Sequence, residues 1–503
     1  MGDRITQVRR VRRRSSTLAV AAVAACSALF PVTRAVAAGL PVLGHGRTSI
    51  GRQSPSVVSP TWITSVSCAS AGNCVAAGFG TDVSGNHVAI VVDETNGIWG
   101  TAMAVRGLAS LSTGGNGLVT SVSCVSAGDC AAVGSYSGPH RTGTFLVNEK
   151  NGKWGIAAEV PGLARLSTRG SADADLVSCA SAGNCSATGA YDMRSTLETG
   201  LNQEKVFAVT ERNGIWGSAQ QVPGLVKIKD AAINSVSCAA AGDCSAVGTL
   251  DARYGGPGFV VSENNGIWGS AQQVPGLAHA GDVGIGPVSC VSAGTCTAGG
   301  FYAGPSSERA FVIEERNGTW STARRVLGSA SLNAGGVASL SCASAGNCSA
   351  AGWYSGPGSG IFVVSEKNGV WDKAAPLGVS AAISRGRDAG IASLSCGSAG
   401  NCGAVGTYLR RSSPNTSFTI RSFAVTEKSG AWGTARELTG PSHLSKGHDV
   451  VIDPVSCGSP GNCGAGGYYV SPDGGTHAFV VNERDGSWRS ARPVRPGARQ
   501  PGR

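Results

Sequence analysis

The cysteines constrain this chain most, because sixteen of the 17 fall into eight pairs of one spacing, C-x5-C, that recur every 52 to 61 residues. We predict that each pair closes a disulfide across a short hairpin, since such a loop can bring two Cβ atoms within bonding distance. The predicted bridges are Cys68–Cys74, Cys124–Cys130, Cys179–Cys185, Cys238–Cys244, Cys290–Cys296, Cys342–Cys348, Cys396–Cys402 and Cys457–Cys463. A zinc site is disfavoured because no histidine repeats with the pairs, and a redox site because one chain does not need eight catalytic copies.

Each cysteine pair belongs to a longer internal repeat, so the chain is an array of eight similar units. Every copy ends with a glutamate, a glycine three residues later and a tryptophan two residues after that. The glutamates are Glu94, Glu149, Glu211, Glu263, Glu315, Glu366, Glu427 and Glu483, and the tryptophans are Trp99, Trp154, Trp216, Trp268, Trp320, Trp371, Trp432 and Trp488. A catalytic acid is needed once, so we expect the glutamates to be structural. They would accept bonds from nearby backbone N–H groups or pair with the Lys, Arg or Asn that follows.

Four strands are predicted in each copy. Examples are residues 64–68 for strand one, 130–136 for strand two, 360–365 for strand three and 216–222 for strand four. Strands three and four are joined by Asn-Gly in six copies, a strong hairpin signal because both residues tolerate positive φ. Eight such meanders predict an all-β fold, an eight-bladed β-propeller of four-stranded antiparallel blades. An open β-solenoid is the alternative. No blade is split between the two chain ends, so the sequence leaves the closure of the ring open.

The repeat also sets the expected domain boundaries. Residues 1–37 are expected to be a signal peptide, 38–61 a linker, 62–497 the propeller and 498–503 the disordered end of a basic tail. The blades are expected at about 62–110, 118–166, 174–228, 233–279, 285–330, 337–379, 391–440 and 452–496.

The first 37 residues have the pattern of an export signal. A basic stretch precedes an apolar run over 18–32, and Ala35-Val36-Ala37 offers a small-x-small cleavage site. We therefore expect a secreted, extracellular protein without a membrane span in its mature form. A permanent N-terminal anchor and a lipid anchor on Cys26 are the alternatives. The twin-arginine route is disfavoured, because it carries proteins that fold in a reducing cytosol.

The net charge of +10 is concentrated at the two ends of the chain. Residues 1–37 hold seven Arg and one Asp, and residues 489–503 hold five Arg and no acid. The folded body is therefore close to neutral, which argues against nucleic acid as a partner, since a nucleic-acid binder needs a basic face within its fold.

No catalytic, metal or cofactor motif is found. The seven histidines share no position in the repeat, and His443 and His448 are expected in a surface loop between blades. We found no nucleophile elbow, phosphate loop or dinucleotide fingerprint in a suitable context. We therefore predict no catalytic residues, no metal and no cofactor, while leaving open whether the protein is an enzyme.

The Glu-x-Asn-Gly-x-Trp turn between strands three and four resembles the Asp-box of sialidase-type propellers. Glu94 and its equivalents stand where that box has Asp, Val92 stands where it has Ser, and Gly97 comes one position late. The resemblance implies blade architecture. Sialidase activity would also require an arginine triad and a Tyr/Glu pair, which cannot be placed in the sequence. The Val-Ser-Cys pattern also resembles repeats of uncharacterised exported bacterial proteins.

A meander places links one-to-two and three-to-four at one face of the ring, here called the uniform face. The other links lie at the opposite face, called the variable face because its loops differ between copies. Several of these loops begin with tyrosine, which suits contact with sugar or protein. The candidate binding residues are Tyr136, Tyr302, Tyr354, Tyr408 and Tyr468. The alternative is that these tyrosines cap strand two.

These features favour a monomeric, non-catalytic binding propeller that recognises a glycan, a cell-envelope component or a protein. A propeller-type glycoside hydrolase or lyase and a structural envelope protein are the alternatives. A hydrolase would need carboxylates that converge on the variable face. The acids available there show no evident convergence in the sequence; they are Asp192, Glu198, Glu204, Asp251 and Glu308.

Overall fold

Two tight turns reverse the chain at the same end of every repeat. In the turn between strands three and four, Asn96 and Gly97 have φ values of 50° and 79°, and both turn residues are left-handed in all eight copies. This confirms the predicted hairpin, since its central residues need positive φ. The N–H of Gly97 donates to the carbonyl of Gly72 in the other turn at 2.7 Å, and the same bond joins the two turns in every copy.

The computed structural model describes residues 59–497 apart from 113–115, 138–141, 168–170, 194–202, 227, 229, 251–255, 329–331, 333, 356–358, 412–417 and 441–444. The predicted signal peptide, Cys26 and residues 498–503 lie outside the described residues.

The first four blades contain these strands: β1 (Ser59–Ser70), β2 (Asn73–Thr81), β3 (His87–Thr95), β4 (Ile98–Trp99) and β5 (Thr101–Ala104); β6 (Gly117–Ser126), β7 (Asp129–Ser137), β8 (Thr142–Lys150), β9 (Lys153–Trp154) and β10 (Ala158–Glu159); β11 (Ala172–Ser181), β12 (Asn184–Met193), β13 (Gln203–Arg212), β14 (Ile215–Trp216) and β15 (Gln220–Gln221); β16 (Ala231–Ala240), β17 (Asp243–Leu250), β18 (Gly258–Asn264), β19 (Ile267–Trp268) and β20 (Gln272–Gln273).

The last four blades contain these strands: β21 (Val283–Ser292), β22 (Thr295–Ala303), β23 (Glu308–Arg316), β24 (Thr319–Trp320) and β25 (Arg324–Arg325); β26 (Ala334–Ser344), β27 (Asn347–Ser355), β28 (Gly360–Lys367), β29 (Val370–Trp371) and β30 (Ala375–Pro376); β31 (Arg387–Ser398), β32 (Asn401–Arg411), β33 (Phe418–Lys428), β34 (Ala431–Trp432) and β35 (Arg436–Glu437); β36 (Val450–Ser459), β37 (Asn462–Val470), β38 (Thr476–Arg484), β39 (Ser487–Trp488) and β40 (Arg492–Pro493), followed by β41 (Arg495–Pro496).

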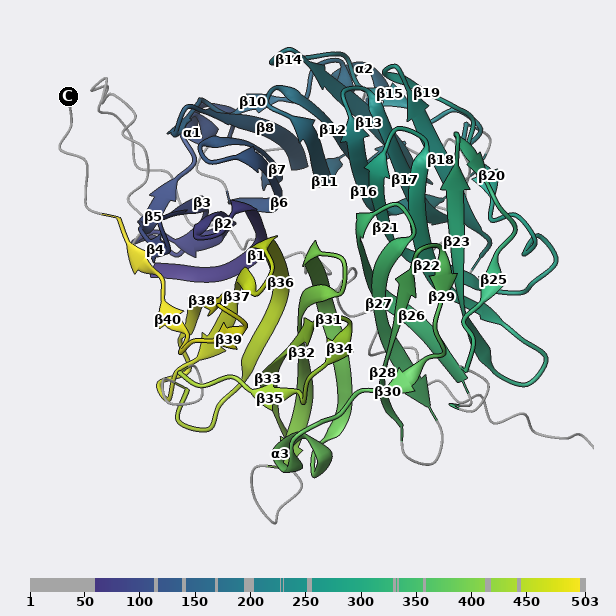
Figure 1. Ribbon diagram of the computed structural model, residues 1–503. Coiled ribbons are helices and arrows are strands. Elements are labelled where there is room, and N and C mark those ends of the chain that lie inside the picture. Colours follow the sequence, from purple (N-terminus) through teal and green to yellow (C-terminus); the bar gives the residue numbers. More distant parts are fainter. Residues whose placement is uncertain are drawn as a thin grey trace, which may run out of the picture. The chain divides into compact units, whose positions relative to one another are not determined.

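Each blade is thus a four-stranded antiparallel sheet whose fourth strand is interrupted. In blade 1, β4 and β5 both pair with β3, and the break falls at Gly100. Strand β1 begins at Ser59, ahead of residue 62 where the sequence places the first blade. The eight sheets form an eight-bladed β-propeller, as predicted (Figure 1).

The ring closes through a C-terminal segment, predicted to end blade 8, that instead pairs with blade 1. Strand β41 pairs in parallel with β5 of blade 1, so that Arg495 lies opposite Thr101. At each other boundary, the link after strand four accepts a bond from the next blade's fourth strand, as when Ala219 N–H donates to Pro161 at 2.7 Å. Pro496 therefore repeats the role of Pro161 between blades 8 and 1. This closure excludes the open solenoid.

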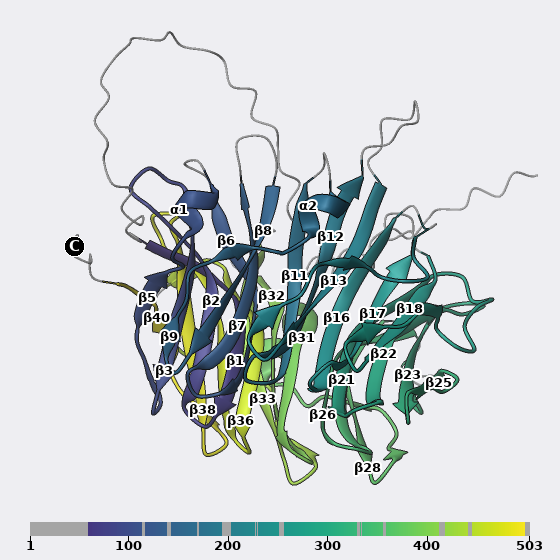
Figure 2. The same cartoon turned by 90° about the horizontal axis from the view of Figure 1, so that it is seen from above.

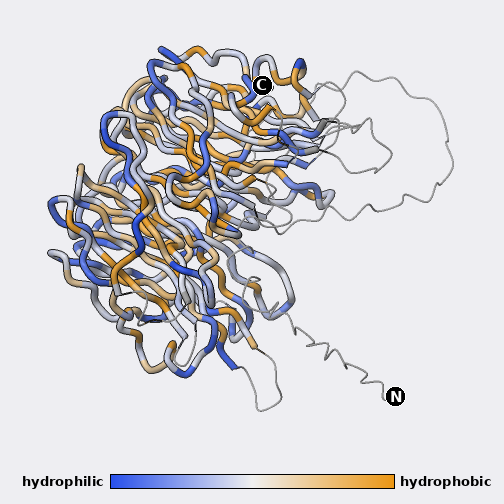
Figure 3. The backbone as a smooth tube through the Cα atoms, turned by 90° about the vertical axis from the view of Figure 1, so that its right-hand side faces the viewer, coloured by the Kyte–Doolittle hydropathy of each residue, from blue (hydrophilic) through white to orange (hydrophobic). Residues whose placement is uncertain are grey.

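The core lies between blades. One buried cluster joins Val75 and Ala77 of blade 1 to Val122 and Phe145 of blade 2, and the other boundaries are built alike. A fully buried phenylalanine occupies the position of Phe145 in the seven blades from 2 to 8. Each such ring contributes about 1.5–3 kcal/mol by burial. Figure 3 shows hydrophobic residues running through the strands and hydrophilic ones at the turns.

The residues that define the sequence repeat share one row of each sheet. In blade 2, Cys124 lies opposite Cys130, Cys130 opposite Glu149, and Glu149 opposite Trp154. All eight predicted disulfides are formed. The constant spacing of the repeat therefore reflects one row at the uniform end of each blade.

The serine before each first cysteine links neighbouring blades around the ring axis. The N–H of Cys124 donates to Ser67 Oγ of blade 1 at 2.9 Å, and equivalent bonds occur at every boundary. The last one, from Cys68 to Ser456 at 2.9 Å, joins blades 1 and 8. The Ser-Cys pair that all eight copies share thus encodes a closed circle of eight bonds.

In the part of the chain that the structure describes, single helical turns lie in three of the links after strand four, namely α1 (Leu108–Leu111), α2 (Leu163–Leu166) and α3 (Ala381–Ser384). Both α1 and α2 lie at one end of the strands in the edge-on view of Figure 2. Among the described residues, none of the helices has the length and apolar character needed to cross a membrane.

Candidate binding face

The repeated glutamates are buried braces between blades. Glu427 accepts bonds from Ser349 Oγ at 2.7 Å and Ser365 Oγ at 2.8 Å, both in the preceding blade. Six of the eight glutamates accept such a bond; they are Glu94, Glu211, Glu263, Glu315, Glu427 and Glu483. Their role is structural, as expected, but the expected partners are wrong. The donors are hydroxyl and amide side chains of the preceding blade, because the carboxyl group leans across the boundary.

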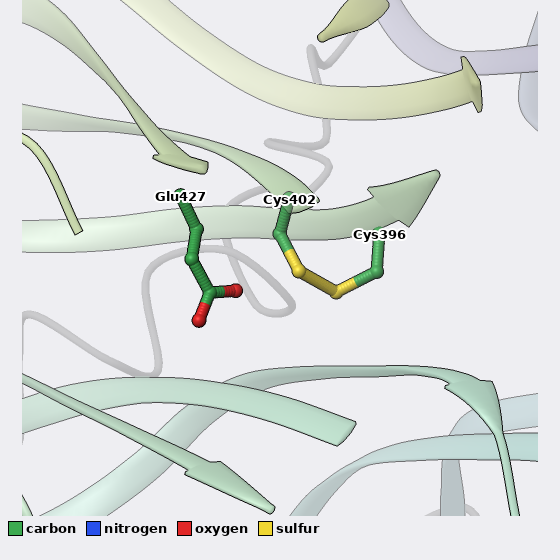
Figure 4. A group of neighbouring side chains, drawn as sticks. All are labelled: Cys396, Cys402 and Glu427. Atoms are coloured by element: carbon green, nitrogen blue, oxygen red, sulfur yellow. A yellow bond between two sulfur atoms is a disulfide. The ribbon is translucent and has the colours of Figure 1, made fainter. Parts of the chain in front are cut away.

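Cysteine and glutamate come together at this end of the blade without making a metal site. Cys396, Cys402 and Glu427 lie within ligand distance of one another, as do Cys457, Cys463 and Glu483. Figure 4 shows that both sulfur atoms of the first group are joined in a disulfide, on the same side of the blade as the glutamate carboxyl group. A disulfide offers no thiolate ligand.

Two of the five candidate tyrosines, Tyr136 and Tyr408, are buried in the cores that join their blades to the preceding blades. The side chains of Tyr136 and Tyr408 are 5% and 1% exposed. The Tyr408 hydroxyl reaches across strand three and donates to Glu437 Oε2 at 2.8 Å, and Tyr136 binds Glu159 in the same way. Burial, with the Glu437 carboxylate next, raises the pKa of Tyr408. Each of these two tyrosines thus ties strand two to strand four. This agrees with the alternative prediction that the tyrosines cap strand two.

Two other candidates, Tyr302 and Tyr354, are half-buried. They pack against the cores that join blades 4 and 5 and blades 5 and 6. Both occupy the position of Tyr136, two residues after a glycine, and therefore point toward the preceding blade.

Tyr468 differs from the other four because it follows its glycine by one residue. Tyr469 holds the position of Tyr136, so Tyr468 projects from the opposite face of the sheet. It lies edge-on to Trp62 of blade 1, with ring centroids 4.7 Å apart. Trp62 lies 6.3 Å from Phe79, its partner across the β1–β2 ladder. These three residues, called here the seam cluster, lie at the variable end of the boundary between blades 8 and 1.

Carboxylates border the seam cluster. Burial, followed by the charges of Asp453 and Asp449, raises the pKa of Tyr468. Asp449 accepts a bond from the N–H of Ile420 at 2.8 Å, which fixes its position beside blade 7. Trp62 and Tyr468 are both half-buried, so their rings remain partly accessible. The seam cluster therefore combines aromatic surface with hydrogen-bond acceptors.

Trp62 stands outside the shared positions of the repeat and was therefore not among the predicted binding residues. Trp62 lies six residues before the first cysteine of its copy, where the other copies have Leu118, Asp173, Ala232, Gly284, Gly336, Gly390 and Val451. Glycine occurs there in three copies and no other residue type occurs twice, although the repeated Ser-Cys follows closely. Aligning the eight copies and looking for the most divergent strand position would have identified it.

Acidic side chains converge on blade 3, contrary to the sequence-based expectation. Asp192 and Glu204 are partners across the β12–β13 ladder, and Asp173 and Asp175 lie on β11. Strand one surrounds the ring axis, so Asp175 has neighbouring blades close by even though its side chain is exposed. Desolvation, then the charges of Asp173 and Glu204, raises the pKa of Asp175 to about 7.

Glu308, another acid that the sequence offered, does not join this group. Glu308 lies on blade 5, where burial and then the charge of Asp282 raise its pKa. Glu198 and Asp251 fall outside the described residues. A small pocket between blades 2 and 3 has Glu159 as its charged residue, and that carboxylate already binds Tyr136.

No protein-family model and no curated protein sequence matches this chain. Similar solved structures are β-propellers. They include the propeller domain of the trilobed protease from Pyrococcus furiosus (8% identity, 74% of this chain, 96% of that chain, TM-score 0.39). Another is a Hadza microbial sialidase (9% identity, 69% of this chain, 63% of that chain, TM-score 0.32). A third is the Aleuria aurantia fucose lectin (10% identity, 64% of this chain, 98% of that chain, TM-score 0.29). Similarity at this level carries no information about the ligand of this chain.

Proposed function

We propose that this chain is a non-catalytic binding propeller that recognises a glycan on its variable face, at the seam cluster. The observation that carries the proposal is the contact between Trp62 and Tyr468, with Asp449 and Asp453 near the tyrosine hydroxyl. An aromatic ring stacks on the apolar face of a sugar, while carboxylate oxygens accept bonds from its hydroxyls. The seam cluster is formed by two blades, so a single copy of the repeat could not supply it.

The export signal predicted in residues 1–37 and the eight disulfides support an extracellular setting, since disulfides persist in oxidising compartments. We propose secretion of the mature ring, with a lipid anchor on Cys26 as the alternative. The mass of the mature N-terminal peptide distinguishes them, because an acylated cysteine would begin the lipid-anchored form.

A glycan array followed by affinity measurements on its hits tests the proposal. We expect Trp62→Ala and Tyr468→Ala to weaken binding at least tenfold, because aromatic anchors carry a large share of binding energy. Trp353→Ala is the matched control. Trp353 is a half-buried tryptophan that packs near Phe301, with ring centroids 6.1 Å apart, on another part of the ring. Equal affinity of the wild type and both seam variants would contradict the proposal.

One observation favours a second candidate function, glycoside hydrolysis. On blade 3 a carboxyl group with a pKa of about 7, Asp175, lies near Asp173 and Glu204. A carboxyl group with a raised pKa can serve as the general acid of a glycosidase beside a second carboxylate. Reducing-sugar release from array hits measures this activity. Turnover that disappears in Asp175→Asn would favour the hydrolase over the binding protein.

A further inference from the structure

The boundaries between blades differ at one position, the residue immediately before the repeated glutamate. In six blades this residue is a serine, threonine or asparagine, and its side chain donates to the glutamate of the next blade. In blades 1 and 5 it is Asp93 and Glu314. A carboxyl group therefore faces Glu149 between blades 1 and 2, and another faces Glu366 between blades 5 and 6.

An asparagine boundary shows what this position has to do. Asn482 accepts a bond from Trp99 Nε1 at 2.6 Å and donates through Nδ2 to Glu94. Asp93 accepts the equivalent bond from Trp154 Nε1 at 3.2 Å. Its second oxygen therefore takes the place of the amide nitrogen. A carboxylate cannot donate a bond there, whereas a carboxylic acid can.

The surroundings of Glu149 favour a proton. Its side chain is 5% exposed, and among the described residues its Oε2 has no hydrogen-bond partner. The charges that act on it are those of Asp93 and Asp129, both negative. Burial, then these two carboxylates, raises the pKa of Glu149 to about 7, and burial raises the pKa of Asp93 as well.

The boundary between blades 5 and 6 is similar but partly compensated. Both carboxyl oxygens of buried Glu366 lack a conventional donor among the described residues. Glu314 accepts a bond from Trp371 Nε1 at 3.3 Å and pairs with Arg316 at 2.7 Å and with Arg324. Burial and then Glu314 raise the pKa of Glu366 to about 7, while Arg324 and Arg316 lower it.

We propose that two boundaries of the ring are each held by a carboxyl pair that shares one proton, Asp93 with Glu149 and Glu314 with Glu366. The shared proton forms the hydrogen bond that a serine, threonine or asparagine side chain donates at the other six boundaries. The two boundaries lie four blades apart and divide the ring into blades 2–5 and blades 6–8 with blade 1. Loss of the protons would loosen the ring along this line, and more so between blades 1 and 2, where none of the described arginines compensates.

The pH range follows from linkage. When a boundary opens, its glutamate returns toward the ordinary value of 4.5, whereas the closed pair holds its proton up to about pH 7. The opening equilibrium should therefore rise by about tenfold per pH unit between these values and level off above pH 7. The closed boundary is most stable at acid pH.

Hydrogen exchange of the full chain, corrected for intrinsic rates, measures this opening. Between blades 1 and 2 the reporter is the N–H of Cys124, which donates to Ser67 of the neighbouring blade. Between blades 4 and 5 it is the N–H of Cys290, where Ser245 and Ser262 both donate to Glu315. We expect protection at Cys124 to fall by at least tenfold from pH 5 to pH 7.5, and protection at Cys290 to change far less.

Two reciprocal substitutions test whether the carboxyl pair causes the pH dependence of protection. Asp93→Asn recreates the boundary found at Asn482 and should remove most of the pH dependence at Cys124. Asn148→Asp should create it between blades 2 and 3, at the N–H of Cys179, which donates to Ser123. Equal pH dependence at Cys124 in the wild type and Asp93→Asn would overturn the proposal. So would protection by Ca²⁺ at pH 7.5 that requires both carboxyl groups, since the pair would then be a cation site.

Discussion

The two faces of this ring are built from the same strands, but residues repeat from blade to blade at one face and vary at the other. At the uniform face, the turns, disulfides, glutamates and tryptophans occur eight times, and almost every one contacts its own blade or the neighbouring blade. At the variable face, the same strands end in residues as different as Trp62 and Asp173. Repetition therefore marks the positions that hold the ring together. Departure from repetition marks the positions available for function.

Reduction of the disulfides, which lie toward the uniform face, should lower the stability of the ring more than any other change. Each closes a loop of six residues' separation, which the loop-entropy estimate values at about 2 kcal/mol. Eight bridges together exceed the stability of an ordinary domain, about 5–15 kcal/mol. We expect full reduction to unfold the ring cooperatively, as followed by circular dichroism. Intact mass measures the number of bridges, and a gain well short of sixteen hydrogens on reduction would contradict eight of them.

Glycine substitutions compare the two faces at matched backbone conformation. Gly72 at the uniform face and Gly85 in the first variable loop have φ values of 71° and 81°. A Cβ on Gly72 would lie 2.7 Å from the Gly97 nitrogen, whereas a Cβ on Gly85 meets nothing within 4 Å. We expect Gly72→Ala to cost about 2–4 kcal/mol and Gly85→Ala about 1 kcal/mol. Urea unfolding measures both, and equal costs would remove the distinction.

The buried glutamates of the uniform face should also make the stability of the ring depend on pH. Burial raises the pKa of Glu149, Glu366 and Glu483 to about 7 from an ordinary 4.5. A raised pKa means that the folded ring binds these protons more tightly than the unfolded chain. The free energy of unfolding should therefore fall as the pH rises from about 4.5 to 7. Urea unfolding at pH 5 and pH 7.5 checks this, and a higher stability at pH 7.5 would contradict it.

The smallest expected effect comes from removing one tyrosine hydroxyl, either at buried Tyr408 or at Tyr468 of the seam cluster. Tyr408→Phe removes a buried hydroxyl bond to Glu437 and should cost about 1–2 kcal/mol without changing glycan affinity. Tyr468→Phe should leave stability nearly unchanged, while weakening the binding of a ligand that contacts its hydroxyl. Thermal unfolding and isothermal titration of the two variants give both quantities. A loss of affinity in Tyr408→Phe alone would place the site elsewhere.

Sequence could predict the blades because their defining contacts are local. Cys124 and Cys130 are close in the chain, and so are Glu149 and Trp154, so their spacing repeats visibly. Contacts between blades join residues far apart, such as Asn482 and Glu94, and depend on which face of a strand a side chain occupies. Grouping Tyr468 with Tyr408 failed for this reason, since a shift of one residue reverses the face.

Ring closure could not be predicted from the sequence for a different reason. The segment Val494-Arg495-Pro496-Gly497 resembles the Val160-Pro161-Gly162 link with one residue inserted. It has no following blade in the chain, so it reads as a basic tail. Only the pairing of β41 with β5 shows that it completes blade 1.

Hydrogen exchange of the ring with and without a bound glycan from the array tests most directly whether function lies on the variable face. We expect added protection in peptides that carry Trp62 at the start of β1 and Tyr468 near the end of β37. Peptides across the turn from Ser70 to Asn73 should be unchanged. Protection confined to the uniform turns, with the seam cluster unaffected, would contradict it.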